Sequence, residues 1–171
     1  MSSPTSATQP SSALAKYARG FDHIAVAVPD LEASISWFTT VLGFSLKERR
    51  NTEGSKTGMI SAVLEAGPLN IVLLQGTTPE SQVSRFVQHY GPGVQHLAIQ
   101  VENIDALSEG LRQSGLGFDT SIIEGGGLRQ MFSTRDHGSG LMIEFIERSA
   151  SGFADQNVTS LFAQLEKKDT F

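Results

Sequence analysis

The sequence predicts an α+β fold built from two tandem copies of one βαβββ unit, followed by a C-terminal helix. The first observation is an internal repeat, because HIAVAVPDLEA at 23–33 matches HLAIQVENIDA at 96–106. Four of these eleven positions are identical and five are close exchanges, at an offset of 73 residues. The second observation is that each copy opens with residues of strand type and continues into a helical pattern. We therefore expect two equivalent modules.

Each element of the unit has its own signal. A polar residue, Asp30 or Asn103, stands where each helix requires an N-cap. Apolar residues at helical spacing mark one face of each helix; they are Leu31, Ile35, Phe38, Val41 and Leu42 in the first copy and Ile104, Leu107 and Leu111 in the second. Three further strands complete each unit, near 44–50, 58–66 and 69–75 and near 118–123, 128–134 and 140–147.

The boundaries follow from composition. Residues 1–19 are polar and predict a disordered leader, and residues 20–168 are expected to form one domain. Within it we expect module one at 20–76, a linker at 77–93, module two at 94–148 and a C-terminal segment at 149–168. The linker contains a short helical stretch at 82–89 that Gly91-Pro92-Gly93 ends. The C-terminal segment becomes an amphipathic helix from about Asn157, and this helix is expected to cover an apolar surface.

Composition excludes several classes of function. The 171 residues include no cysteine, which rules out disulfides, thiolate zinc sites, iron–sulfur clusters and a cysteine nucleophile. The formal charge of −5, without a basic cluster, predicts no binding to nucleic acid. No apolar run approaches the roughly 20 residues of a membrane span, and no signal peptide is recognisable. We expect a cytoplasmic protein with a small-molecule partner and no membrane association, and any metal must be held by His, Asp or Glu.

Two histidines and one glutamate stand out as candidate metal ligands. A single histidine in a strand is most often structural, but His23 and His96 occupy the same position of the two repeats, so both can face one shared cleft. Glu144 lies in the apolar strand GLMIEFIER, where an unpaired carboxylate is costly to bury. Its counterpart in the first repeat is Ile71 or Val72, depending on one gapped residue. Two His and one carboxylate with open positions are typical of non-haem Fe(II) oxygenases.

Glu147 lies three residues after Glu144 and has the opposite parity in the same strand. Side chains alternate between the two faces of a strand, so we expect Glu147 to face solvent beside Arg148.

The paired units, with DHIAVAVPDLEAS and VQHLAIQV, resemble the vicinal-oxygen-chelate superfamily, which includes glyoxalase I, methylmalonyl-CoA epimerase and several dioxygenases. Three stretches resemble the catalytic C-terminal half of 4-hydroxyphenylpyruvate dioxygenase: SQVSRFVQHYGPGVQHLAI, LRQMFS with IEFIER, and GFADQNVTSLFAQLE. The resemblance implies a cupped sheet around a metal site, with His23, His96 and Glu144 as catalytic iron ligands. It also implies substrate-binding positions at Ser61, Gln82, Gln95, Gln130, Phe153 and Asn157.

The chain departs from this family in two places. Leu74 stands where the family typically has Asn, and the segment between 118 and 130 is shorter than in the family. Both departures point away from 4-hydroxyphenylpyruvate itself as substrate. Structural interpretations also stay open, because Gln82 and Gln130 are compatible with surface amides, and Phe153 and the last helix with a simple core lid.

These observations lead to one expected function and two alternatives. We expect an Fe(II)-dependent dioxygenase that acts on a 2-oxo acid with O2 as co-substrate, closed by the C-terminal gate helix and assembled as a homodimer. Co, Ni, Mn or Zn can replace iron in the protein as isolated. The first alternative is a metal-dependent isomerase or lyase of the methylmalonyl-CoA epimerase or glyoxalase type. The second is a metal-free small-molecule binding protein.

Overall fold

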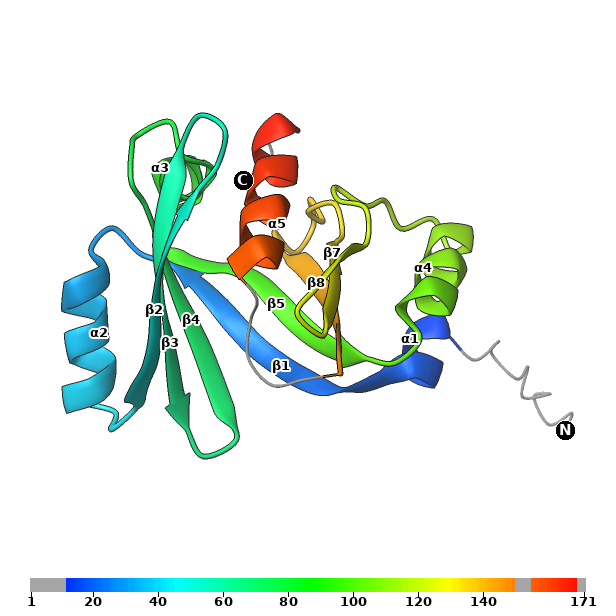
Figure 1. The fold of residues 1–171 in the computed structure, drawn as a ribbon, viewed down its shortest axis with the longest axis horizontal. Helices are drawn as coiled ribbons and strands as arrows, with labels where there is room; N and C mark the ends of the chain where they lie inside the picture. Colours follow the sequence, from blue (N-terminus) through cyan, green and yellow to red (C-terminus); the bar gives the residue numbers. More distant parts are fainter. Residues whose placement is uncertain (1–11, 150–154, 169–171) are drawn as a thin grey trace, which may run out of the picture.

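The computed structural model describes residues 12–149 and 155–168 and contains one curled eight-stranded sheet with helices on both faces (Figure 1). The strand order is β2-β3-β4-β1-β5-β8-β7-β6. Module one comprises β1 (Ala18–Ala27), α2 (Leu31–Thr40), β2 (Ser45–Glu53), β3 (Gly58–Ala66) and β4 (Leu69–Gly76). Module two comprises β5 (Gly93–Val101), α4 (Ile104–Gln113), β6 (Ile123–Gly125), β7 (Leu128–Phe132) and β8 (Met142–Arg148). The predicted α+β fold with two βαβββ modules is confirmed.

The two modules join through their first strands. β1 and β5 pair antiparallel at the centre of the sheet, and in each module the last strand runs parallel to the first. Ile24 is paired with Ile71 in module one, and Leu97 is paired with Ile143 in module two. This register aligns Val72 with Glu144 and so decides between the two counterparts that the sequence left open.

Each module fixes its helix with two polar contacts. The predicted N-caps are confirmed, because Asp30 Oδ1 accepts from Ala33 N at 2.9 Å and Asn103 Oδ1 accepts from Ala106 N at 3.2 Å. A second contact comes from the last strand of the module. In module one, the side-chain oxygen of Gln75 accepts from the backbone N of Leu31 at 2.6 Å.

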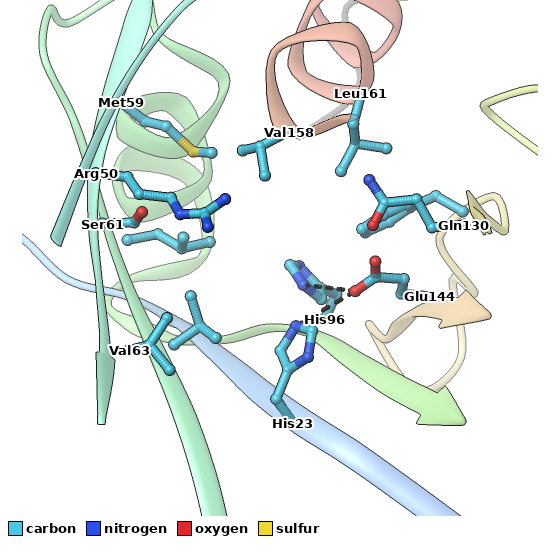
Figure 2. Close-up of a pocket in the computed structure, with 13 residues that line it drawn as sticks. His23, Arg50, Met59, Ser61, Val63, His96, Gln130, Glu144, Val158 and Leu161 are labelled. Atoms are coloured by element: carbon cyan, nitrogen blue, oxygen red, sulfur yellow. Dashed lines mark ion pairs between the residues drawn. The ribbon is translucent and has the colours of Figure 1, made fainter. Parts of the chain in front are cut away.

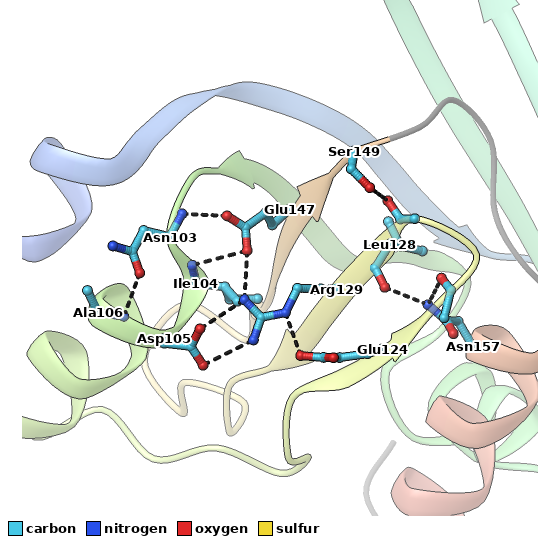
Figure 3. Close-up of polar contacts among 12 residues, drawn as sticks. Asn103, Ile104, Asp105, Ala106, Glu124, Leu128, Arg129, Glu147, Ser149 and Asn157 are labelled. Atoms are coloured by element: carbon cyan, nitrogen blue, oxygen red, sulfur yellow. Dashed lines mark hydrogen bonds and ion pairs between the residues drawn. The ribbon is translucent and has the colours of Figure 1, made fainter.

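Glu147 makes the corresponding contact in module two. Its carboxylate accepts from the backbone N of Asn103 at 2.6 Å and from Nη1 of Arg129 at 3.0 Å (Figure 3). The expectation that Glu147 simply faces solvent is therefore wrong. The side chain of Glu147 does point away from the face of β8 that bears Glu144, as predicted. The N-terminus of α4 lies on that outer face, however, and its backbone N–H groups bind the Glu147 carboxylate.

The helices divide the core into outer and inner parts. On the outer face, Leu31 and Ile35 of α2 pack on β3 and β4, and Ile104 and Leu107 of α4 pack on β7 and β8. On the inner face lie α3 (Gln82–Tyr90), close to the linker helix predicted at 82–89, and α5 (Asp155–Lys167), with Phe162 in the inner core. Figure 1 shows α5 over the hollow of the sheet, between β2 and the β7–β8 side.

Two predicted boundaries need correction. Part of the leader expected to be disordered forms α1 (Ala13–Tyr17), because Leu14 and Tyr17 pack on the apolar cluster under α4. Residues 1–11 lie outside the described residues. The strand expected at 118–123 is only the short β6, preceded by a single bridge between Phe118 and Ser133. In the described part of the chain, no helix is long and apolar enough to cross a membrane.

Candidate metal centre

The three expected ligands come together on the inner face of the sheet. His23 lies on β1, His96 on β5 and Glu144 on β8, next to Ala98 of β5 (Figure 2). Oε2 of Glu144 is 3.3 Å from Nε2 of His23 and 3.6 Å from Nε2 of His96. All three residues are buried, with exposed fractions of 5%, 8% and 2%. One ligand atom from each lies within 4.8 Å of the others, which is close enough to surround a single ion.

Outer contacts hold both imidazoles in this orientation. Nδ1 of His23 is 2.8 Å from Oδ1 of Asp22, and the Asp22 carboxylate receives two bonds from the guanidinium of Arg148 at 2.6 and 2.8 Å. Nδ1 of His96 contacts the side-chain oxygen of Gln95. Each Nδ1 is thus engaged away from Glu144, which leaves Nε2 to face it. This is the usual support for histidines that bind a metal through Nε2.

The charges of the cluster depend on these neighbours. Burial lowers the pKa of His23, but the contacts with Asp22 and Glu144 outweigh it and raise that pKa to about 9. Burial and the nearby charge of His23 hold the pKa of His96 well below its usual range. Burial raises the pKa of Asp22, but the bonds from Arg148 and His23 outweigh it and hold the pKa well below the usual range. Without a metal ion, a protonated His23 therefore lies between the carboxylates of Asp22 and Glu144. A metal ion bound at this place would replace the proton of His23.

The donor set fits a divalent transition metal. Two imidazole nitrogens and one carboxylate oxygen are ligands that iron, cobalt, nickel and zinc accept, and all three are removed from bulk water. Within residues 12–149 and 155–168, no other group of three His, Asp or Glu side chains gathers this closely.

A cavity of about 60 Å³ opens beside the three side chains. Its polar wall residues outside the triad are Arg50, Ser61 and Gln130, and the remaining wall is apolar. Ser61 and Gln130 occupy equivalent positions, because Ser61 pairs with Leu74 in module one and Gln130 with Ile146 in module two. The apolar lining consists of Met59, Val63, Val72, Leu74, Phe132, Val158 and Leu161, the last two from α5.

The other sequence-predicted site residues fall in different places. Gln82 and Gln95 line an adjoining cavity of about 50 Å³ that shares His96 and Phe132 with the first. Gln82 is 6% exposed and Gln130 is 1% exposed, so neither is a surface amide.

Asn157 does not line either cavity. Its side-chain amide donates to the carbonyls of Gly125 and Leu128 at 2.9 and 3.0 Å, which ties α5 to the β6–β7 turn (Figure 3). Phe153 lies outside the described residues.

Sequence reasoning missed three residues of this site. Asp22 and Arg148 hold His23, and Arg50 of β2 enters the cavity wall (Figure 2). The signal for Asp22 was its place directly before His23. Arg50 has no such signal, because it stands in the polar run KERRNTE; only the structure shows that 48, 50 and 52 of β2 are more buried than their neighbours.

A tandem βαβββ sheet with a buried His-His-Glu cluster defines a class of proteins that build metal sites between paired modules. The chain belongs to the Glyoxalase/Bleomycin resistance protein/Dioxygenase superfamily, whose family model matches residues 20–145. The vicinal-oxygen-chelate resemblance of the sequence is therefore confirmed.

Relatives of two kinds match the chain. Mouse mitochondrial methylmalonyl-CoA epimerase is 34% identical over 106 residues, which cover 61% of this chain and 58% of the relative. A 4-hydroxyphenylpyruvate dioxygenase of Legionella pneumophila (strain Corby) is 30% identical over 86 residues, covering 48% of this chain and 25% of the relative. The chain thus spans less than two thirds of these curated relatives.

Solved structures also match the chain. A mutant of 4-hydroxymandelate synthase from Streptomyces coelicolor superposes with a TM-score of 0.78 at 22% identity, covering 88% of this chain and 54% of that one. At this identity the likeness shows the fold alone. Methylmalonyl-CoA epimerase from Mycobacterium tuberculosis superposes with a TM-score of 0.67 at 28% identity, covering 78% of this chain and 90% of that one. Family membership alone therefore does not choose between oxygenase and epimerase chemistry.

Proposed function

We propose that the chain is an Fe(II)-dependent dioxygenase that acts on a 2-oxo acid and uses O2 as co-substrate. The observation that carries this proposal is the asymmetry of the site, since the position equivalent to Glu144 is the apolar Val72. Three protein ligands leave positions open for a two-atom chelating group and for O2, as in non-haem iron oxygenases. A fourth protein ligand from module one would close one of these positions.

The side chains of the site have separate tasks in this proposal. His23, His96 and Glu144 hold the iron, which when bound supplies the reactivity toward O2 that no side chain offers. Asp22 and Gln95 keep the two imidazoles in place.

The cavity wall would handle the substrate. Ser61 and Gln130 offer a hydroxyl and an amide to its polar groups. Val158 and Leu161 of α5 cover the cavity and limit the access of water. The overall reaction releases CO2 from the 2-oxo acid, and one oxygen atom of O2 enters the new carboxylate while the other becomes a hydroxyl group.

The alternative is a metal-dependent epimerase, and the 34% identity to the mouse epimerase favours it. Such a reaction needs a general base that removes a proton from the substrate beside the metal. Among the described residues that line the cavity, Glu144 is the one carboxylate, and it belongs to the proposed ligand set. This leaves the epimerase without an evident carboxylate base, so we place it second.

One experiment separates the two functions. The protein is loaded with Fe(II) without air and then offered a panel of 2-oxo acids, with O2 uptake and CO2 release recorded together. In parallel, methylmalonyl-CoA is incubated in D2O with protein loaded with Co(II), and deuterium incorporation at C2 is measured. We expect equal O2 uptake and CO2 release with at least one 2-oxo acid and no deuterium incorporation. Deuterium incorporation without O2 uptake would overturn the proposal. The control variant His137→Ala, which changes an exposed histidine, should give the same result as the wild type in both assays.

We also propose that the protein is a homodimer of metal-loaded chains. Light scattering coupled to size-exclusion chromatography tests this proposal, with twice the chain mass of 18.4 kDa as the expected result.

A further inference from the structure

Arg50 is a buried cation at the cavity wall that the metal chemistry does not require. It lies on β2 with its guanidinium pointing into the cavity (Figure 2), and its side chain is 9% exposed. Its neighbour Arg49 points to the other face, where its side chain is 47% exposed and pairs with Glu32. An arginine is seldom buried unless a charged or polar group pairs with it, and Glu48 of the same strand pairs with Arg50.

The surroundings of Arg50 form a small polar wall. Ser61 is its direct cross-strand neighbour on β3 and is 5% exposed. Glu48 accepts from Nε of Arg50 at 2.6 Å and also pairs with its Nη2 at 2.5 Å. The Glu48 side chain is 37% exposed, so its charge is partly hydrated. This contact holds the guanidinium in a fixed position at the cavity, beside the hydroxyl of Ser61.

The cavity therefore has two polar ends. The His-His-Glu cluster forms one end, and Arg50 with Ser61 forms the other, on the module-one wall (Figure 2). Apolar side chains, among them Val63, Val72 and Leu74, line the same cavity. A substrate that chelates the metal with its 2-oxo acid group extends along apolar walls toward Arg50.

The chemistry of arginine limits what can bind there. A guanidinium only donates hydrogen bonds, so its partner must be an acceptor. Its fork of N–H groups matches a carboxylate, and such charge-assisted bonds are stronger than neutral ones. A distal methyl group offers no acceptor to the guanidinium. The opposite end of the substrate should therefore carry an acidic group.

We propose that Arg50, with Ser61 beside it, binds a carboxylate at the distal end of the substrate, so that the substrate is a 2-oxo acid with a second acidic group. This inference rests on the proposed function, because it takes the 2-oxo acid as the group held at the metal. It makes Arg50 the residue that determines specificity in this chain.

The test compares ligands that differ only at the distal end. We use three pairs: 2-oxoadipate with 2-oxohexanoate, 2-oxoglutarate with 2-oxopentanoate, and 4-carboxyphenylpyruvate with 4-methylphenylpyruvate. Binding to Zn(II)-loaded protein is measured by titration calorimetry, since zinc permits binding without oxidation. The variants are Arg50→Met and Arg50→Lys, and Arg49→Met is the matched control on the same strand.

We expect the wild-type protein to bind the carboxylate member of at least one pair about 10-fold or more tightly than its methyl partner. Arg50→Met should abolish this preference and leave the affinity for the methyl partner unchanged. Arg50→Lys keeps the charge but not the fork, so it should retain part of the preference. Arg49→Met should behave as the wild type.

The outcomes separate this inference from the proposed function. Binding of both members of every pair with equal affinity overturns the inference and leaves the dioxygenase proposal standing. A preference that survives in Arg50→Met overturns it as well, and Arg50→Lys decides the question in the same way if Arg50→Met does not fold. A preference that depends on Arg50, without O2 uptake by the Fe(II)-loaded protein, supports the acidic subsite and overturns the dioxygenase. Absence of binding by all six ligands overturns both.

Discussion

The two modules share one backbone plan but contribute unequally to the candidate site. Both hold their helix with a polar residue of the last strand, Gln75 in module one and Glu147 in module two. At another pair of equivalent positions, module one has Val72 where module two has Glu144. The comparison teaches that equivalent positions keep their structural task where they fix the fold. At the cavity the residues at equivalent positions differ. Module two contributes the candidate metal ligand Glu144, whereas module one contributes the apolar side chain of Val72 to the cavity wall.

The largest expected effect comes from removing the carboxylate of module two. Glu144→Ala should leave the protein folded but reduce its metal content to background, because one of three ligands is lost. Turnover should fall by more than the roughly 10–100-fold typical of changes outside the ligand set. Metal analysis and O2 uptake measure the two effects, with Val72→Ala as the equivalent change in module one. A Glu144→Ala protein that still binds one metal ion per chain would contradict the assignment.

The reverse substitution makes the modules alike. Val72→Glu places a second carboxylate beside the cluster, where it can become a fourth ligand. Metal content should stay at one ion per chain, while O2 uptake with 2-oxo acids should fall at least about 10-fold, because an open position is closed. The metal-free variant should be less stable than the wild type, since a second carboxylate is buried in the cavity that Glu144 also lines. Undiminished O2 uptake would show that the reaction does not depend on an apolar residue at position 72.

A smaller effect is expected from the support of His23. Asp22→Ala removes the contact to Nδ1 and leaves Arg148 without its carboxylate partner. Metal affinity should fall by about 10–100-fold, the usual cost of losing an outer contact of a ligating histidine. Competition with a chromophoric chelator measures this affinity. Asp136→Ala, in an exposed turn, is the control, and equal affinities of the two variants would contradict the supporting role.

The smallest effects concern the shared helix contacts. Gln75→Ala and Glu147→Ala should each lower the free energy of unfolding by about 1 kcal/mol, the typical value for losing a helix N-terminal contact. Neither should change metal content or turnover, because both side chains lie outside the cavity lining. Urea unfolding measures the stabilities. Loss of metal in Glu147→Ala would show that the two faces of β8 are not independent.

The repeat explains why much of the fold was predictable. His23 and His96 could be paired from sequence because they begin the two matching segments of the repeat, and Asp30 and Asn103 could be identified as caps for the same reason. Glu144 was recognisable because its strand is otherwise apolar. These signals are local in sequence, or repeat at one fixed offset.

Residues whose role depends on contacts between distant segments could not be predicted. Arg148 acts through Asp22, which is 126 residues away in the chain. Asn157 matched a pocket position, but its amide is taken up by carbonyls of the β6–β7 turn. The inward turn of Arg50 depends on the register of β2 against β3, and α1 depends on an apolar surface under α4.

The most direct test of the central claim is anomalous diffraction from crystals of the metal-loaded protein, recorded at the absorption edge of the metal. The account predicts one anomalous peak per chain, bounded by Nε2 of His23, Nε2 of His96 and the carboxylate of Glu144 at roughly 2.0–2.2 Å. No fourth protein ligand should come from β4, so the peak should face the cavity on the side of Val72. A peak at other residues, or no peak at this cluster in protein that holds one metal ion per chain, would contradict the account.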